Sequence, residues 1–256
     1  MMLTLYKQEV YKQIHKIGWW IALAFMVLVQ ITFGIVGKRN PSMFAPSDLV
    51  GNSYIGGGLV MLIAIASTAS IIAMEFQYGT MKQLLYRQYY RSQVFISKIL
   101  TALTQLVFLQ AVAGLMTVAL TLILFPSYHW AQHVGNLTHG LIYLRALGSD
   151  FLVGLLLLSL VLLLSTVFKS NAAAIATGLV GYFLAQLAST LMIAMIAWQH
   201  WTKFLPFTFL LTNYQIQSAD FAKLTLFSTP MMIGGTLLYT VVFTLIAYLS
   251  FRKRSV

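Results

Sequence analysis

Three histidines, His129, His133 and His139, are the residues in this chain best suited to binding a metal. His129 and His133 are four residues apart, a spacing that can bring two ligands to one helix face. A zinc site needs further ligands, and neither a cysteine nor a carboxylate lies close to them. We therefore interpret the histidines as solvated side chains and predict no metal site.

Carboxylates are too sparse to form a catalytic pair. Asp150 stands five residues from Arg145 and is predicted to pair with it, whereas Asp220 is predicted to be solvated. G-x-x-x-x-G-K-[ST], H-E-x-x-H and G-x-S-x-G are all absent from the sequence. The chain also has no cysteine, which excludes disulfides and cysteine metal sites. We expect neither a cofactor nor an enzymatic activity of the chain's own.

The composition indicates an integral membrane protein. Of the 256 residues 59% are hydrophobic and only 8% are charged, whereas soluble proteins carry about a quarter charged residues. The net charge of +11 comes from 16 Lys and Arg against 5 acids. Basic ends of membrane spans facing an anionic lipid surface explain this excess, so the lipid bilayer is the expected partner and nucleic acid is not.

Six apolar stretches are long enough to cross a bilayer. They predict an all-α membrane protein with a single transmembrane domain over residues 1–256 and spans at 19–36, 55–74, 99–125, 151–168, 172–198 and 231–251. No internal repeat is visible, which argues against an inverted-repeat carrier.

The distribution of basic residues predicts that both termini are cytoplasmic. Six spans place the two termini on one side. The larger basic group falls on that side: Lys7, Lys12, Lys16, Lys82, Arg87, Arg91, Lys98, Lys169, Arg252, Lys253 and Arg254. The smaller group falls on the other side: Lys38, Arg39, Arg145, Lys203 and Lys223. We expect a multi-pass protein of a bacterial plasma membrane.

Residues 1–17 are predicted to form an amphipathic helix in the membrane interface. Its basic side carries Lys7, Lys12 and Lys16, and its apolar stripe is formed by Leu3, Tyr6, Val10, Ile14 and Ile17. The alternative is a simple cytosolic extension of the first span.

The predicted spans contain almost no ionisable side chain, which argues against a proton- or ion-coupled carrier and against an intramembrane hydrolase. Their polar residues are mainly amides, Ser and Thr. We predict that a pathway for an amphipathic or apolar substrate is lined by Gln30, Gln105, Gln110 and Gln186.

The polar stretch between the second and third spans, Glu75 to Arg91, is basic and rich in aromatic residues. Gly79 breaks the chain, and Thr80 with Gln83 has the spacing of a capping box. A short helix with one contact face of Met81, Leu84 and Leu85, and with Arg87 and Arg91 one turn apart, would suit a protein partner. The alternative is a basic loop anchored by snorkelling Tyr and Arg side chains.

Glu75 ends the second span, where a carboxylate is costly unless it is paired or hydrated. Its candidate partners are Arg87, Arg91 and a lysine of the N-terminal helix. A solvated helix-end charge is the alternative. We favour a structural ion pair that sets the angle of the polar stretch.

The pattern Glu75-Phe-Gln-Tyr-Gly-Thr-Met-Lys-Gln-Leu-Leu85, followed by Arg91-Ser and by Lys98 at the start of the next span, resembles ABC-2 type transporter permeases. The six-span layout and Lys203-Phe-Leu-Pro-Phe207 fit the same family. Bacterial peptide and antibiotic exporters, including bacteriocin-immunity and bacitracin-resistance types, are the most similar members. The likeness in layout covers nearly the whole chain, but its specific part is the polar stretch.

This resemblance implies a separate ATPase subunit, which would hold ATP and Mg²⁺, and a second permease copy or related chain. Residues 1–17 would be a connecting helix, 77–91 a cytoplasmic coupling helix and 199–230 an extracellular re-entrant segment. The residues implied to contact the ATPase are Gln77, Tyr78, Gly79, Thr80, Met81, Lys82, Leu84, Leu85, Arg87 and Arg91. The sequence thus predicts an exporter permease. The alternatives are a partner-free membrane immunity protein and a secondary carrier.

Overall fold

The computed structural model describes residues 2–80, 89–168, 170–218 and 220–253 of the chain. Within these ranges 6 helices are long and apolar enough to cross a membrane, which confirms the predicted all-α membrane fold. They are α2 (Ile17–Arg39), α4 (Gly56–Gln77), α6 (Arg91–Leu124), α7 (His139–Val167), α8 (Asn171–Trp198) and α11 (Thr229–Lys253).

Shorter elements connect these helices or precede them. Helix α1 (Met2–Ile14) leads into α2, and α3 (Pro46–Gly51) with the 3₁₀ turn η1 (Ser53–Ile55) joins α2 to α4. A two-stranded antiparallel hairpin, β1 (His133–Val134) with β2 (Leu137–Thr138), precedes α7. Between α8 and α11 lie η2 (His200–Phe204), η3 (Pro206–Leu211), α9 (Thr212–Gln217) and α10 (Phe221–Thr225).

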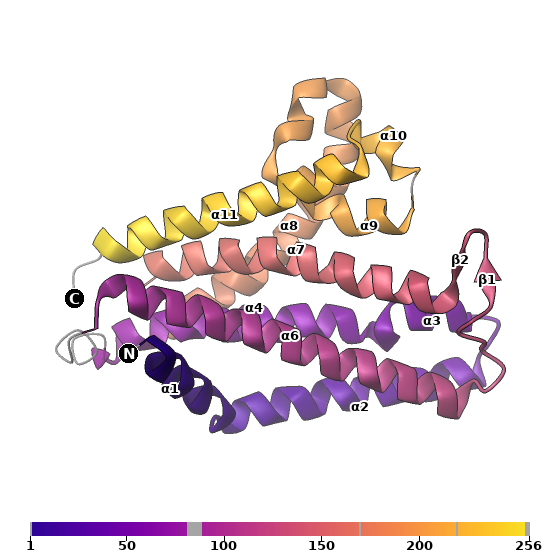
Figure 1. Ribbon diagram of the computed structural model, residues 1–256, viewed down its shortest axis with the longest axis horizontal. Coiled ribbons are helices and arrows are strands. Elements are labelled where there is room, and N and C mark those ends of the chain that lie inside the picture. The colour runs from indigo at the N-terminus through magenta and orange to yellow at the C-terminus, as the bar shows by residue number, and fades with distance from the viewer. Residues whose placement is uncertain (1, 81–88, 169, 219, 254–256) are drawn as a thin grey trace.

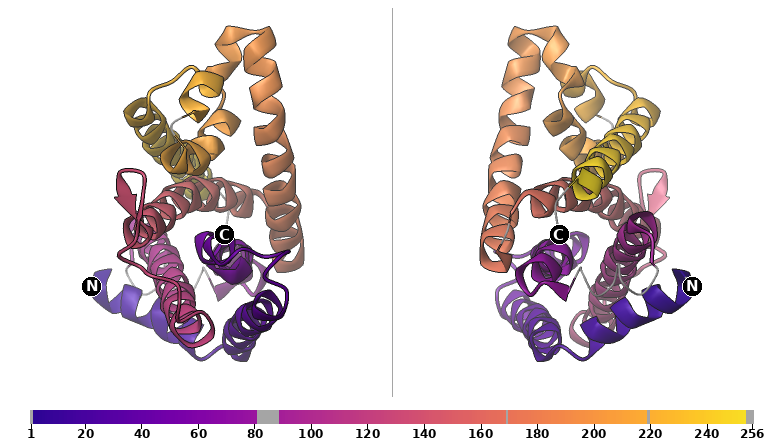
Figure 2. Two further views of the ribbon diagram at one scale, coloured as in Figure 1. Left: turned by 90° about the vertical axis from the view of Figure 1, so that its right-hand side faces the viewer. Right: turned by 90° about the vertical axis from the view of Figure 1, so that its left-hand side faces the viewer.

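Helix α7 runs through the middle of the bundle, with α11 on one side and α4 and α6 on the other (Figures 1 and 2). Small residues allow the central helices to approach closely. A Cβ atom at Gly178 of α8 would lie 3.2 Å from Ile65 of α4, and one at Gly154 of α7 would lie 3.0 Å from Met61. Buried aliphatic side chains of α4, α6 and α7 fill the space between these contacts.

Both chain termini lie at one end of the bundle (Figure 1). Two hydrogen bonds bring four helix ends together there. The Asn171 backbone N–H donates to Gln77 Oε1 at 2.7 Å, and Arg91 Nη1 donates to the Arg252 carbonyl at 2.6 Å. We call this region, with α1 and these ends of α4, α6, α8 and α11, the terminal end. The hairpin and α3 lie at the opposite end (Figure 1).

Two spans begin earlier than the apolar pattern predicts: α6 at Arg91 instead of residue 99, and α7 at His139 instead of residue 151. Hydropathy marks the part of a helix that lies in hydrocarbon, whereas the backbone stays helical until a cap ends it. Gln93 accepts from the Tyr90 backbone N–H at the start of α6. The Thr138 hydroxyl accepts from the Leu141 N–H at the start of α7.

Helix α1 forms as predicted, but its inward face differs from the predicted one. The face buried against the bundle is Leu5, Glu9 and Gln13. Of the predicted apolar stripe, Leu3, Ile14 and Ile17 are exposed, whereas Tyr6 and Val10 are partly buried beside α6. Lys7, on the predicted basic side, is exposed as well. Helix α1 therefore contacts the bundle through a face of mixed polarity.

The segment 199–230 folds back onto the first turns of α11. Phe209 of η3 stacks on Phe227 and contacts Tyr239. Gly235 of α11 packs against the Phe209 ring so closely that a Cβ there would collide with it, whereas Gly234 has open space around it. The absence of a side chain at Gly235 therefore sets how this segment docks.

We expect Gly235→Ala to lower the thermal unfolding temperature in detergent, because forcing a methyl group against the buried Phe209 ring costs about 1–3 kcal/mol. Gly234→Ala is the matched control, since it makes the same chemical change in open space. Equal unfolding temperatures for the two variants would contradict this packing.

Candidate functional site

A cluster of four charged side chains joins three helices at the terminal end. Lys98 of α6 lies 2.9 Å from Glu75 Oε1 and 3.2 Å from Glu9 Oε2. Lys12 of α1 lies 2.7 Å from Glu9 Oε1 and 3.2 Å from Glu75 Oε1. Each carboxylate thus bridges both ammonium groups, and we call Glu9, Lys12, Glu75 and Lys98 the charge cluster.

Three of the four residues of the charge cluster are buried, and only the Lys12 side chain, 50% exposed, reaches solvent. Lys98 is 0% exposed, Glu9 4% and Glu75 7%. The Lys98 ammonium also donates to the Ile71 carbonyl at 3.0 Å, which satisfies a third N–H. Charges taken out of water are tolerated only when they are paired and hydrogen-bonded. The cluster therefore fixes α1 to α4 and α6 as long as all four charges are present.

The pKa values of the α1 groups reflect this mutual stabilisation. Burial by itself raises the pKa of Glu9, but the charge of Lys98 and the hydrogen bond from Lys12 outweigh it, so the pKa is lowered. Burial likewise works to lower the pKa of Lys12, but Glu9 and Glu75 outweigh it, so the pKa is raised. Both groups are held in their charged forms.

A cavity of about 350 Å³ adjoins the charge cluster, between α1 and the end of α4. Glu75 Oε2 is buried and has no hydrogen-bond partner. Lys16, which also lines this cavity, has its Nζ 3.6 Å from Met74 Sδ. Burial lowers the pKa of Lys16 despite the attraction of Glu9.

The predicted partner-binding stretch starts directly beside the charge cluster. Gly79 adopts φ +67°, a left-handed conformation that ends α4. Tyr78 is 66% exposed. The Thr80 hydroxyl donates to the Glu75 carbonyl at 3.4 Å and so turns back onto α4. Its predicted capping partner Gln83 lies outside the described residues, as do Met81, Lys82, Leu84, Leu85 and Arg87.

Both ends of this stretch are tied to other helices. Gln77 accepts the hydrogen bond from Asn171 at the start of α8, and Arg91 donates to Arg252 near the end of α11. With the charge cluster, these bonds connect the stretch 77–91 to α1, α4, α6, α8 and α11.

For Glu75, the structure gives one of the predicted partners, a lysine of the N-terminal helix, which is Lys12. Arg91 instead binds Arg252. The ion pair of Glu75 with Lys98, and the part that Glu9 takes in the same cluster, were not predicted. The sequence did contain an indication that Glu9 is paired, because it is the only acid in an otherwise basic N-terminal helix. It also lies four residues from both Leu5 and Gln13, and so on the same face of that helix.

The four glutamines of the predicted substrate pathway do not converge. Gln30 is fully buried and donates to the carbonyls of Ser53 (2.9 Å) and Ala113 (3.1 Å), so it cross-links α2, η1 and α6. Gln110 donates to the Leu147 carbonyl. Gln186 is half-buried on α8. Gln105 alone has a buried amide nitrogen without a partner.

The remaining polar predictions fall on the opposite side of the molecule. His133 is part of β1 and His139 begins α7, and the described residues contain no group of three metal-ligating side chains. The predicted pair of Asp150 with Arg145 is wrong, since no such ion pair exists and Asp150 lies instead beside Asn213 of α9. Asp220 forms an exposed pair with Lys223 at 3.0 Å.

Residues 20–256 match the family described as "Protein of unknown function (DUF2705)". The chain belongs to this family. It is also 28% identical over 244 residues to the "Uncharacterized membrane protein YdbK" of Bacillus subtilis (strain 168), which covers 92% of this chain and 95% of the relative. The DUF2705 match includes Glu75 and Lys98 but not Glu9 and Lys12, which lie on α1. Neither description assigns an activity; the relative's name agrees with the membrane fold.

We expect Lys98→Met to destabilise the protein by about 3–5 kcal/mol, because it leaves two buried carboxylates with one fewer cation. The added change Glu75→Gln should recover part of this loss by removing one uncompensated charge. Thermal unfolding in detergent measures both effects. Lys223→Met is the control, since the Lys223–Asp220 pair is on the surface. Equal unfolding temperatures for Lys98→Met and Lys223→Met would contradict the role of the charge cluster.

The lowered pKa of Glu9 gives a pH dependence with a defined sign. The stability that ionised Glu9 contributes is fully present above the pKa of an unfolded glutamate, about 4.3, and is lost as the pH falls through the lower folded-state value. We expect the difference in unfolding temperature between the wild type and Glu9→Gln to be constant above about pH 5 and to shrink toward pH 3. A difference that stays constant over this range would show that Glu9 is not held ionised.

Proposed function

We propose that this protein is the transmembrane permease subunit of an ATP-binding-cassette exporter. It would move an amphipathic or lipophilic substrate out of the cell or the membrane, and a separate subunit would hydrolyse ATP. The observation that supports this proposal is the anchoring of the stretch 77–91. That stretch carries the resemblance to ABC-2 permeases, and its flanking contacts join five helices.

The charge cluster suits the transmission of a movement. A partner pressing on the stretch 77–91 would displace the end of α4, and Glu75 would carry Lys98 and Lys12 with it. Pulling these buried charges apart costs several kcal/mol, so α1, α4 and α6 would move as one rigid body. The exposed Tyr78 side chain lies next to this junction and would contact the partner.

The outer helices suit lipid contact and association with a second permease chain. The apolar windows of α2, α8 and α11 are only 22%, 22% and 17% buried. Such faces must be covered by lipid or by protein. A homodimer or a pair of related chains would enclose a pathway between two copies, which agrees with the separate positions of the four glutamines within one copy.

This proposal requires the terminal end to face the cytoplasm and an ATPase to bind there. We expect a photo-crosslinking residue, p-benzoylphenylalanine, in place of Tyr78 to capture an ATP-binding-cassette ATPase in intact cells of the native host. The same residue in place of Met43 is the matched control, because Met43 is 78% exposed and lies beyond α2 at the opposite end. Mass spectrometry of the cross-linked products identifies the captured protein.

Recovery of no ATPase at position 78, or of the same proteins at both positions, would overturn the proposal. In that case the partner-free alternatives predict that transport or toxin protection persists after ATP depletion. Loss of that activity on ATP depletion, together with the Tyr78 crosslink, supports the exporter.

A further inference from the structure

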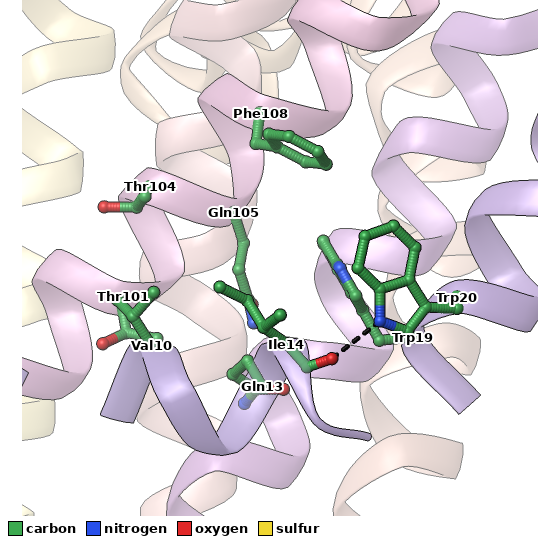
Figure 3. Close-up of a pocket in the computed structure, with 9 residues that line it drawn as sticks. All are labelled: Val10, Gln13, Ile14, Trp19, Trp20, Thr101, Thr104, Gln105 and Phe108. Carbon is green, nitrogen blue, oxygen red and sulfur yellow. Dashed lines mark hydrogen bonds between the residues drawn. The ribbon is translucent and has the colours of Figure 1, made fainter. Parts of the chain in front are cut away.

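A cavity of about 180 Å³ separates α1 from α2 and α6 (Figure 3). Its walls are mainly apolar and aromatic, formed by Val10 and Ile14 of α1, Trp19 and Trp20 of α2, and Phe108 of α6. Trp20 Nε1 donates to the Ile14 carbonyl at 2.7 Å, which fixes one wall. The cavity lies beside the charge cluster but contains none of its four residues, so it is a separate site.

One polar group in this cavity lacks a partner. Gln105 is only 6% exposed and lines the cavity from α6. Its Oε1 accepts a hydrogen bond from Ser67 Oγ at 2.7 Å, which sets the orientation of the amide. Its Nε2 is buried and makes no hydrogen bond. A buried donor without an acceptor is destabilising, and a ligand with an acceptor oxygen would remove this cost.

The depth of Gln105 indicates which ligand this is. The apolar stretch at α6 covers residues 99–125, and Gln105 lies six residues after its start, about 9 Å along the helix at 1.5 Å per residue. The α1 side chain of Tyr6 contacts Thr104 at 2.7 Å, so the interfacial helix lies at the same level. Gln105 therefore lies within about two helical turns of the level at which the ester carbonyls of phospholipids are found.

We propose that this cavity binds one phospholipid, with an acyl chain between the two tryptophans and Phe108 and an ester carbonyl accepting from Gln105 Nε2. The lipid would fill the gap between α1 and α6. It would thereby link the position of α1 to the membrane, independently of whether the protein is an exporter.

Native mass spectrometry of the full chain tests this binding. Phosphatidylglycerol is titrated into delipidated protein in detergent, and the fraction carrying one lipid is measured. We expect Gln105→Leu to weaken binding about tenfold, since one charge-neutral hydrogen bond is lost. Val10→Trp should abolish binding by filling the cavity. Val107→Trp is the matched control, because Val107 is 53% exposed on α6 and does not line the cavity.

Unfolding temperatures of the variants without added lipid separate loss of binding from loss of fold. Wild-type protein that holds lipid no better than Val10→Trp, or a Gln105→Leu variant of equal melting temperature that binds lipid as tightly as the wild type, overturns the proposal. Retention of detergent in place of lipid overturns it as well.

Discussion

The buried Lys98 ammonium is the group on which the terminal end depends. It sits two turns inside α6 and holds Glu75 of α4 and Glu9 of α1 at the same time. Neither carboxylate has another fully buried cation near it, so the positions of three helices follow from one side chain. A membrane protein cannot use the hydrophobic effect to choose among neighbouring helices in lipid, and a paired charge gives that specificity instead.

The charge cluster also explains why α1 buries Glu9 together with Leu5 and Gln13. An amphipathic helix at a lipid surface normally presents its charged side to water. Here Glu9 instead faces the bundle, because it pairs with Lys98 and Lys12, while Lys7 stays exposed. The same orientation leaves Val10 and Ile14 lining a cavity of about 180 Å³ with Trp19, Trp20 and Phe108. Charge pairing and cavity are thus two consequences of one helix orientation.

Membership in the DUF2705 family and the similarity to the B. subtilis membrane protein agree with the fold and do not assign an activity. The link to ABC-2 permeases comes from the stretch after α4 and from the way that stretch is anchored. The described residues at its two ends, Glu75, Gln77 and Arg91, contact α1, α6, α8 and α11. These contacts are the structural support for the proposal that the stretch couples to a partner.

The sequence alone determined the membrane class and the approximate positions of all six spans, because the partition of apolar residues into lipid is a local property of each stretch. It also marked Glu75 as a charge that needed a partner. The tertiary structure decided that the partners are Lys12 and Lys98, that Arg91 binds Arg252, and that Asp150 lies beside Asn213 and not Arg145. These pairings join residues from different helices, and helix packing, which no local pattern encodes, brings them together. Gln105 shows the same division: its type and depth can be read from the chain, but its unpartnered nitrogen arises only because α1, α2 and α6 leave a cavity around it.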